Sequence, residues 1–144
     1  MTSLKLELPY PPTINSYYQY HGHRRFVGTI GKLYKNRVAK IVRELNAYMG
    51  AGRLEVTIIL CPPDKRVRDI DNPVKPLLDS LVQAKCFADD SLIDSLLILR
   101  GDKVKNGKAL ASVLKGSKYT KAAYMDLMGL LYEILWKVRK EGLM

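Results

Sequence analysis

The sequence predicts a single α/β domain, in which a small mixed β-sheet is packed with helices and followed by a C-terminal helix. Three observations predict this class. Apolar and polar residues alternate in LKLEL (4–8), which indicates a strand with one buried face. The run LEVTIILC (54–61) is β-branched and apolar, which is typical of a buried strand. Between and after these runs, apolar residues recur at helical spacing, and 144 residues suffice for one hydrophobic core.

The first strand should end in PYPPTIN (9–15), because proline cannot continue a strand ladder. A loop rich in aromatic residues, glycine and basic residues follows in SYYQYHGHRRFVG (16–28). From about Gly31 we expect a helix that closes at Gly50 and Gly52. Its apolar stripe consists of Leu33, Val38, Ile41, Val42, Leu45 and Tyr48, and its other face carries Lys32, Lys35, Arg37, Lys40 and Arg43.

After the buried strand, an extended basic segment, PPDKRVRDID (62–71), leads to Asn72 and Pro73. An N-cap candidate followed by proline is typical of a helix start, and this helix is expected to run to about Ala84. The run LIDSLLILRGDK (92–103) predicts a third long strand. The pair Asn106-Gly107 then predicts a hairpin turn into ALASVL (109–114).

The last helix is expected over residues 122–140. Its apolar residues fall on one stripe, formed by Tyr124, Leu127, Met128, Leu131, Leu135 and Val138. An isolated helix of this length is marginal in water, so we expect the stripe to pack on the core or across a dimer.

The composition favours a polyanionic partner. Lys and Arg number 24 against 14 Asp and Glu, which gives a net charge of +10 and a pI near 9.6. A basic field concentrates phosphates, and nucleic acid is the commonest such partner, although an anionic membrane or plain solubility would also use this charge. The two cysteines, Cys61 and Cys86, are not spaced like the ligands of a metal ion. No segment has the pattern of a signal peptide or of a membrane span. We therefore expect a soluble, cytoplasmic protein.

Two carboxylates stand one residue apart in the basic stretch RVRDIDNPVKPLLD (66–79). In an extended segment Asp69 and Asp71 would project to the same face, and their repulsion would be relieved by Mg²⁺ or Mn²⁺, which prefer oxygen ligands. The alternative is that both acids are surface ion-pair partners of Arg66 and Arg68. The basic surround favours the metal, because phosphodiester hydrolysis needs a cation at the phosphate and basic residues along the strand.

Other side chains give weaker signals. His21 and His23 lie two residues apart in a basic loop, but a zinc site would need more ligands, so phosphate contact or solvation is the better interpretation. Cys86 has no evident base partner and is interpreted as structural. The tyrosines of SYYQY (16–20) could stack on bases or pack against the core.

The string RDIDNPVKPLLDSL (68–81), followed by KCFADDSLI (85–93), resembles the signature of the RusA family of Holliday junction resolvases. The opening LPYPPTINSYY (8–18) is also similar to the start of that family, and the resemblance extends over roughly residues 4–114. It implies a homodimeric, Mg²⁺-dependent endonuclease of bacteria and their phages, which cuts two strands symmetrically at four-way DNA junctions. Residues 1–115 would form this endonuclease core, with 116–144 as a helical extension.

By position in that signature, Asp69, Asp71 and Asp90 match the metal-binding acids of the family, and Lys75 matches its catalytic lysine. Asn72 and Asp79 also match pattern positions, without an assigned role. Cys86 departs from the pattern, because the family often has glycine there, so the turn before Asp89 is expected to differ.

The sequence is therefore interpreted as a structure-selective endodeoxyribonuclease that resolves branched DNA in a bacterial or phage-infected cell. The DNA arms would be held by the basic face of the first helix together with Asn15, Arg24, Arg25, Lys65, Arg66 and Arg68. Two alternatives remain open from the sequence: a non-catalytic basic DNA-binding protein, and a metal-dependent nuclease that acts on flaps or RNA.

Overall fold

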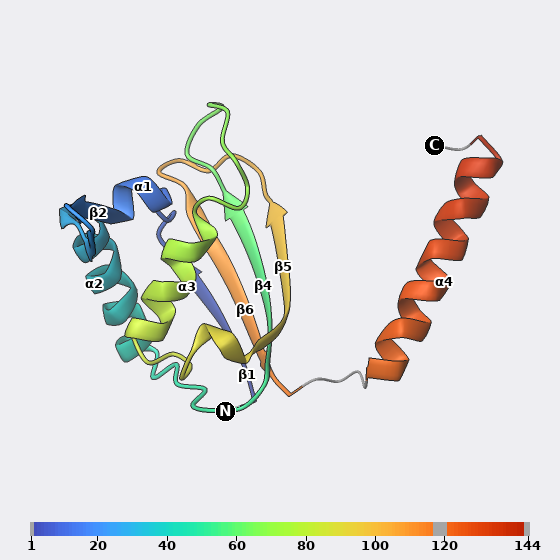
Figure 1. The fold of residues 1–144 in the computed structure, drawn as a ribbon, viewed down its shortest axis with the longest axis horizontal. Coiled ribbons are helices and arrows are strands. Elements are labelled where there is room, and N and C mark those ends of the chain that lie inside the picture. Colours follow the sequence, from blue (N-terminus) through green and yellow to red (C-terminus); the bar gives the residue numbers. More distant parts are fainter. Residues whose placement is uncertain (1, 117–120, 143–144) are drawn as a thin grey trace.

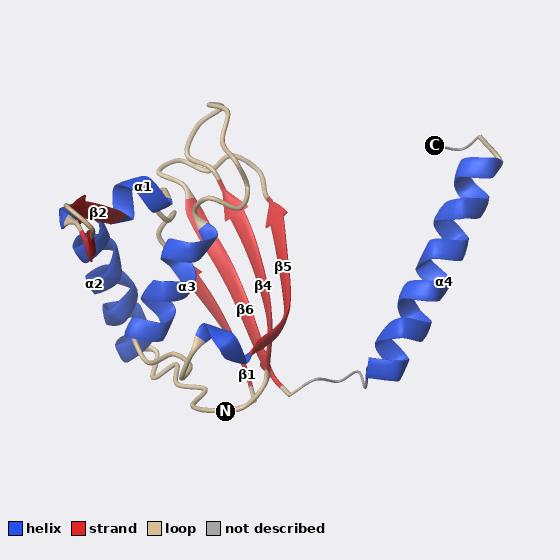
Figure 2. Ribbon diagram, viewed as in Figure 1, coloured by secondary structure: helices blue, strands red, loops and turns tan. Residues whose placement is uncertain are grey.

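The computed structural model describes residues 2–116 and 121–142 (Figure 1). In the last helix it describes the exposure of side chains from residue 128 onward. A four-stranded mixed sheet runs in the order β1-β6-β4-β5 (Figure 2). Strand β6 is antiparallel to both β1 and β4, whereas β5 is parallel to β4. The strands are β1 (Ser3–Leu8), β4 (Leu54–Cys61), β5 (Ile93–Arg100) and β6 (Lys108–Lys115). The predicted α/β class with a small mixed sheet is confirmed.

Helices cover one face of this sheet. Helices α2 (Thr29–Glu44) and α3 (Val74–Gln83) contribute buried residues that join one cluster with the inward-facing strand residues. Because side chains alternate along a strand, β1, β4 and β6 each turn one set of residues into this core and the other set outward. The inward set includes Leu6, Ile58 and Ala111, which lie in register across the three strands.

The remaining elements are short. Helix α1 (Ile14–Tyr17) leads directly into a hairpin of β2 (Tyr18–His21) and β3 (Arg24–Val27), which we had expected to be a loop. A 3₁₀ turn, η1 (Asp90–Leu92), precedes β5. The last helix, α4 (Lys121–Lys140), follows β6 and was expected at nearly the same residues.

The expected stripe of the first helix was partly wrong. Leu33 is 62% exposed, and Tyr34, which the pattern had missed, is buried with Val38 and Val42. The helix also ends at Glu44, earlier than expected, so that Leu45 and Tyr48 lie outside it. The hydroxyl of Tyr34 donates to the carbonyl of Pro9, which satisfies its polar end while the ring is in the core.

The expected hairpin between the last two strands was also wrong. Asn106 and Gly107 do form a turn, with φ of 66° at both residues, but β5 and β6 are not paired. Their connection passes the end of β4 instead, where the amide of Gly101 donates to the carbonyl of Leu60. A local turn signal identifies a reversal of the chain but does not specify which strand becomes the neighbour.

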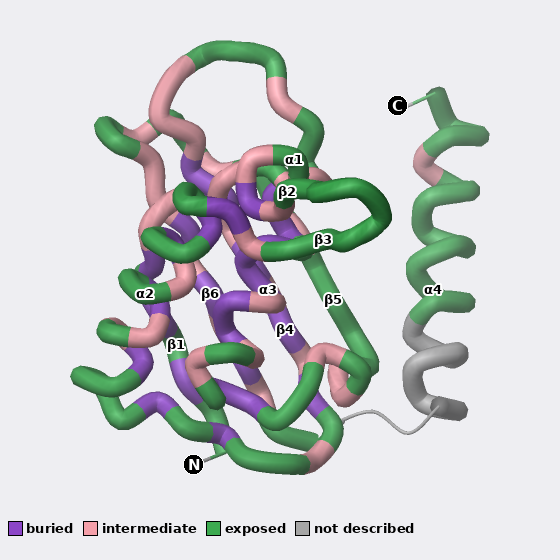
Figure 3. The backbone as a smooth tube through the Cα atoms, turned by 60° about the vertical axis from the view of Figure 1, so that its left-hand side comes forward, coloured by how far each residue is buried: buried purple, intermediate pink, exposed green. Residues whose placement is uncertain are grey.

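Helix α4 stands clear of the sheet in two views of the molecule (Figures 1 and 3). Its described side chains, from Met128 onward, are exposed except for Val138, which is partly buried. Tyr124 and Leu127 of the expected stripe lie outside the residues whose side chains the structure describes. The expected packing partner of this helix is thus absent from the described residues of the single chain and stays a prediction. No described helix is both long and apolar enough to traverse a bilayer.

Candidate active site

The loop of residues 62–73 connects β4 to α3 and carries the first two predicted metal ligands. Long-range hydrogen bonds hold it in place: Arg100 donates from Nη2 to the carbonyl of Arg68 at 2.8 Å, and the side-chain Oδ1 of Asn72 accepts from the amide of Ile14 at 2.8 Å. The position of Asn72 predicted that it would be the N-cap of α3, and this prediction is wrong. The helix starts after Pro73 without a side-chain cap, and Asn72 instead joins this loop to α1.

The arginines of the loop are paired with an acid that the sequence interpretation had overlooked. Asp64 Oδ2 lies 3.0 Å from Arg66 Nη2, and Asp64 Oδ1 lies 2.7 Å from Arg68 Nη1. Bonds from Arg68 and Arg66 hold the pKa of Asp64 well below its usual range. The spacing of two and four residues was a local signal that could have identified this pairing.

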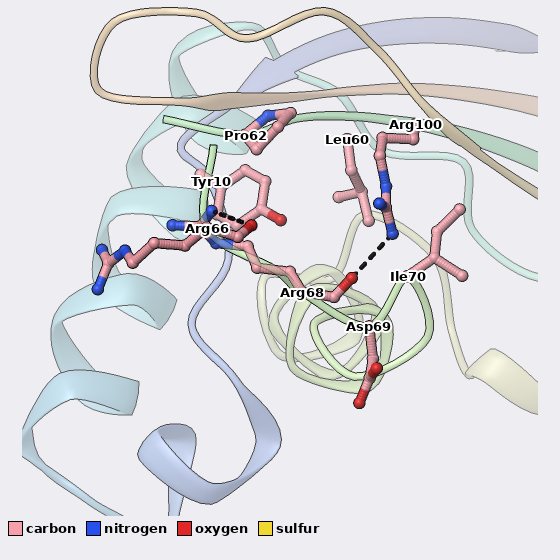
Figure 4. A pocket seen from close by; sticks show the side chains of 8 residues that line it. All are labelled: Tyr10, Leu60, Pro62, Arg66, Arg68, Asp69, Ile70 and Arg100. Atoms are coloured by element: carbon pink, nitrogen blue, oxygen red, sulfur yellow. Dashed lines mark hydrogen bonds between the residues drawn. The ribbon is translucent and has the colours of Figure 1, made fainter. Parts of the chain in front are cut away.

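Asp69 and Asp71 have no ion-pair partner among the described residues, and both are exposed. The alternative in which they neutralise Arg66 and Arg68 is therefore not what the structure contains. In Figure 4 the carboxylate of Asp69 points away from Arg100 and the neighbouring pocket residues. These two acids are available to a ligand from outside the loop.

The third predicted acid lies beside the predicted lysine. Lys75 Nζ is 2.6 Å from Asp90 Oδ2 and 2.9 Å from Asp79 Oδ1. Lys75 and Asp79 are one helical turn apart on α3, whereas Asp90 begins the 3₁₀ turn after it. The spacing of four residues on a helix already predicted that Lys75 and Asp79 would be neighbours, whereas only the fold brings Asp90 to them.

A tyrosine connects this cluster to the basic hairpin. The hydroxyl of Tyr18 donates to Asp79, and the guanidinium carbon of Arg25 lies 4.3 Å from the centre of the Tyr18 ring. A depression of about 350 Å³ opens here, lined by Tyr18, Lys75, Asp79 and Asp90 among others. Burial, followed by the nearby charges of Asp90 and Asp89, raises the pKa of Asp79 to about 6.

Within the described part of the chain, no three acid, histidine or cysteine side chains are grouped so as to hold a metal ion together. The loop bends at Ile70 and Asp71 and is not an extended strand. The reason for expecting Asp69 and Asp71 on one face was strand geometry, and this reason does not apply here. The structure places these two acids in the loop and Asp90 beside Lys75. A shared metal site of all three stays a prediction.

Most of the predicted DNA-binding residues are exposed. Arg24 and Arg25 lie on β3, Asn15 on α1, and Lys65 and Arg66 in the loop. Arg68 is the exception: it is partly covered, it pairs with Asp64, and its guanidinium carbon lies 6.0 Å from the Tyr10 ring centre. Most of the basic face of α2 is also exposed, at Lys32, Arg37, Lys40 and Arg43.

The cysteines and histidines take no part in the cluster. His21 and His23 are exposed at the hairpin turn, and Cys61 and Cys86 are buried free thiols. Burial raises the pKa of the Cys86 thiol to about 11, which makes it a poor nucleophile. Cys86 can replace the glycine that the family often has, because its own φ is not positive. The residue of this turn with left-handed backbone is Lys85, with φ of 62°.

The net charge of +10 and the exposed basic residues of β3, α2 and the loop give an α/β domain the electrostatic character of a protein that binds nucleic acid. The family model described as endodeoxyribonuclease RusA matches residues 9–113. This chain belongs to the RusA family of endodeoxyribonucleases, as the resemblance of its motifs had predicted.

Relatives support the same membership. The chain is 37% identical over 109 residues to the crossover junction endodeoxyribonuclease of Enterobacteria phage HK97, a match covering 75% of this chain and 91% of the relative. The crossover junction endodeoxyribonuclease RusA of Escherichia coli K12 is 30% identical over the same share of both chains. A second family model, described as the N-terminal part of motility protein A, matches only residues 101–142 and shows no membership.

Proposed function

We propose that this protein resolves Holliday junctions and other branched DNA by paired, symmetrical phosphodiester cuts that depend on Mg²⁺. The relatives that share most of its length are crossover junction endodeoxyribonucleases by name. Among the residues themselves, one observation supports the metal: Arg66 and Arg68 pair with Asp64, and Asp69 and Asp71 are exposed without an ion-pair partner in the described part of the chain.

The available donors fit the chemistry of a hard divalent cation. Membership of the RusA family implies that the enzyme uses a divalent metal ion. Carboxylate oxygens are the ligands that Mg²⁺ and Mn²⁺ prefer. Asp69, Asp71 and Asp90 would hold it. When bound, Mg²⁺ would polarise the scissile phosphate and lower the pKa of the attacking water.

Lys75 is proposed as the catalytic cation of the protein itself. Its ammonium group lies within 2.9 Å of the carboxylates of Asp79 and Asp90, and Lys75 lines the same depression as Tyr18. From there it would stabilise negative charge on the phosphate oxygens or on the departing 3′ oxygen. Asp79 would keep the lysine in place, and Tyr18 would in turn hold Asp79 through its hydroxyl.

We further propose that the active form is a homodimer. A four-way junction has approximate two-fold symmetry, so two sites related by a dimer axis would make the two symmetrical cuts. The lack of a complete three-ligand cluster among the described residues of one chain is consistent with a site that is completed on assembly. The exposed residues Asn15, Arg24, Arg25, Lys65 and Arg66, with Arg68 beside them, would contact the DNA backbone in bacterial or phage-infected cells.

The test uses the purified full chain and labelled synthetic DNA. A four-way junction, a flap, a linear duplex and an RNA hairpin would each be incubated with Mg²⁺, with Mn²⁺ and with EDTA. We expect paired cuts in the junction with either metal and none with EDTA. Binding without cutting in Mg²⁺ would identify a non-catalytic DNA-binding protein, and preferential cutting of the flap or RNA would identify the other alternative.

A further inference from the structure

The three tyrosines of the segment SYYQY (16–20) have different surroundings. Tyr17 is 1% exposed, and its hydroxyl accepts a hydrogen bond from Ser80 in the core. Tyr18 is partly buried, and its hydroxyl donates to Asp79. Tyr20 is 69% exposed. Packing against the core and stacking on bases were both open from the sequence, and among the three only Tyr20 presents a largely exposed ring to a ligand.

The strand register places Tyr20 on the same side of the hairpin as the candidate active site. Opposite residues of an antiparallel pair share a face, and here Tyr20 lies opposite Arg25 and Tyr18 opposite Val27. The guanidinium carbon of Arg25, 4.3 Å from the centre of the Tyr18 ring, agrees with one shared face. Tyr18 and Val27 line the depression that contains Lys75. Tyr20 and Arg25 therefore extend this wall by one residue pair, about 7 Å farther toward the hairpin tip.

The base of the hairpin is fixed to the helices beside it. The amide of Gly28 donates to the carbonyl of Tyr17 at 2.9 Å. A Cβ at Gly31 of α2 would lie 2.5 Å from the same carbonyl oxygen, so this approach of α2 requires glycine. The strands beyond this base are exposed along most of their length (Figure 3). Tyr20 is thus held in place beside the depression while its ring stays open to solvent, and binding a ligand there orders little of the chain.

An exposed aromatic ring beside an arginine suits a nucleotide. The ring can stack on the base, and a guanidinium that lies over Tyr18 can still donate from its edge to a phosphate. Within a duplex both faces of each base are covered by neighbouring bases, and separating two of them costs a few kcal/mol. A branch point exposes base faces without this cost. A ring at the position of Tyr20 would therefore favour branched over linear DNA.

We propose that Tyr20 and Arg25 form a nucleotide subsite next to the candidate active site. Tyr20 stacks on the base of a nucleotide that flanks the scissile phosphate, and Arg25 contacts the phosphate of that nucleotide. This inference rests on the proposed function, because that function places the scissile phosphate at Lys75. Tyr20 acts as a positioning residue: it holds the neighbouring nucleotide, and the strand then presents its phosphate to the cluster around Lys75.

The first measurement detects the stacking without any cleavage. Junctions carry the fluorescent base 2-aminopurine at successive positions around the branch point, one at a time, and bind the full chain in Ca²⁺ or EDTA. We expect one position at which the native protein and Tyr20→Phe quench the fluorescence, and at which Tyr20→Ala loses this quenching. Phe26→Ala is the matched control, because Phe26 is 45% exposed on the opposite face of the same hairpin, and it should quench as the native protein does.

The second measurement is single-turnover cleavage at saturating protein in Mg²⁺. Tyr20→Ala should cut the junction about fivefold or more slowly, whereas Tyr20→Phe and Phe26→Ala should keep the native rate. An abasic nucleotide at the quenched position should slow the native protein by a similar factor. It should not slow Tyr20→Ala further, because the ring and the base act through one contact.

Each other outcome separates this subsite from the proposed function. If Tyr20→Ala quenches and cuts as the native protein does, the subsite is wrong and the nuclease function stands. If Tyr20→Ala and the abasic nucleotide slow cleavage independently, or if Phe26→Ala fails in the same way, Tyr20 only supports the hairpin and the inference is overturned. If the native protein does not cut junctions at all, the proposed function fails, while the fluorescence still supports or overturns the stacking.

Discussion

Lys75 Nζ, in the first turn of α3, lies 2.6 Å from Asp90 Oδ2, in the 3₁₀ turn that comes after the helix. The two residues are 15 positions apart in the sequence. Their contact brings the predicted catalytic lysine to one of the three predicted metal ligands. It also places that ligand against a helix that the core holds firmly, through the fully buried Leu77 and Leu81.

Lys75→Ala is expected to lower the rate of junction cleavage by about 100-fold or more, because the site loses the charge that stabilises the transition state. Junction affinity should change by no more than about threefold, since one exposed contact is lost among many phosphate contacts. Single-turnover cleavage and gel-shift binding measure the two effects separately. Lys137→Ala, which removes an exposed lysine of α4, is the control and should retain the native rate.

Asp79 should make the stability of the protein depend on pH. Its pKa is about 6 in the folded chain against 3.8 for a free side chain, because burial and the charges of Asp90 and Asp89 outweigh the contact with Lys75. The folded state therefore binds this proton more tightly. Its stabilising effect is complete below pH 3.8 and is lost as the pH rises through 6.

Asp79→Asn keeps the shape and removes the ionisable group. We expect it to raise the free energy of unfolding by about 1 kcal/mol at pH 7.5, with the gain shrinking as the pH falls toward 4. Urea unfolding at a series of pH values measures this difference. A difference that is the same at every pH would show that Asp79 ionises normally in the folded protein.

Asn72→Ala should destabilise the loop that carries Asp71. The amide of Ile14 would lose its acceptor, at a cost of about 1–2 kcal/mol in unfolding free energy. Cleavage should also fall, because the loop loses its connection to α1. Asn36→Ala, at an exposed position of α2, provides the comparison and should change neither stability nor cleavage. Equal unfolding free energies for the two variants would contradict the role assigned to Asn72.

Junction binding should weaken steeply with salt, because each contact between a basic residue and a phosphate releases counterions. Arg25→Ala is expected to reduce the slope of log affinity against log salt by about one. Arg53→Ala removes an arginine that pairs with Asp94 and should leave the slope unchanged. A native slope near zero would mean that phosphate contacts do not dominate binding.

The sequence predicted the sheet and the main helices because their signals are local. Alternation in β1 and the apolar run of β4 depend only on which side chains face the core. Strand pairing is different, since it depends on where the chain goes after a turn. The turn at Asn106 and Gly107 was correctly predicted, yet β6 pairs with β4 and β1 because the connection crosses the end of β4.

The candidate site shows the same division. The motif singled out Lys75 and Asp90 as candidates, but only the fold reveals their contact with each other and the contact of Tyr18 with Asp79. Arg100, which fixes the loop through the carbonyl of Arg68, has no signal in the sequence, because a bond to backbone requires no particular partner residue. Asn72 was assigned to the start of α3, but its side-chain oxygen accepts from the amide of Ile14 at the start of α1, which is 58 residues away in the sequence.

We propose that Asp69, Asp71 and Asp90 hold the catalytic metal. Asp71→Asn tests it most directly, because the change removes one anionic oxygen while keeping the shape of the side chain. Junction binding would be measured in Ca²⁺ or EDTA, and cleavage in Mg²⁺, beside Asp94→Asn as a control at an acid that pairs with Arg53.

We expect Asp71→Asn to cut at least about 100-fold more slowly while binding the junction as tightly as the native protein or more tightly, because a negative charge facing the phosphates has gone. Asp94→Asn should cut at the native rate. Cleavage by Asp71→Asn at the native rate would contradict the assignment of these acids to the metal.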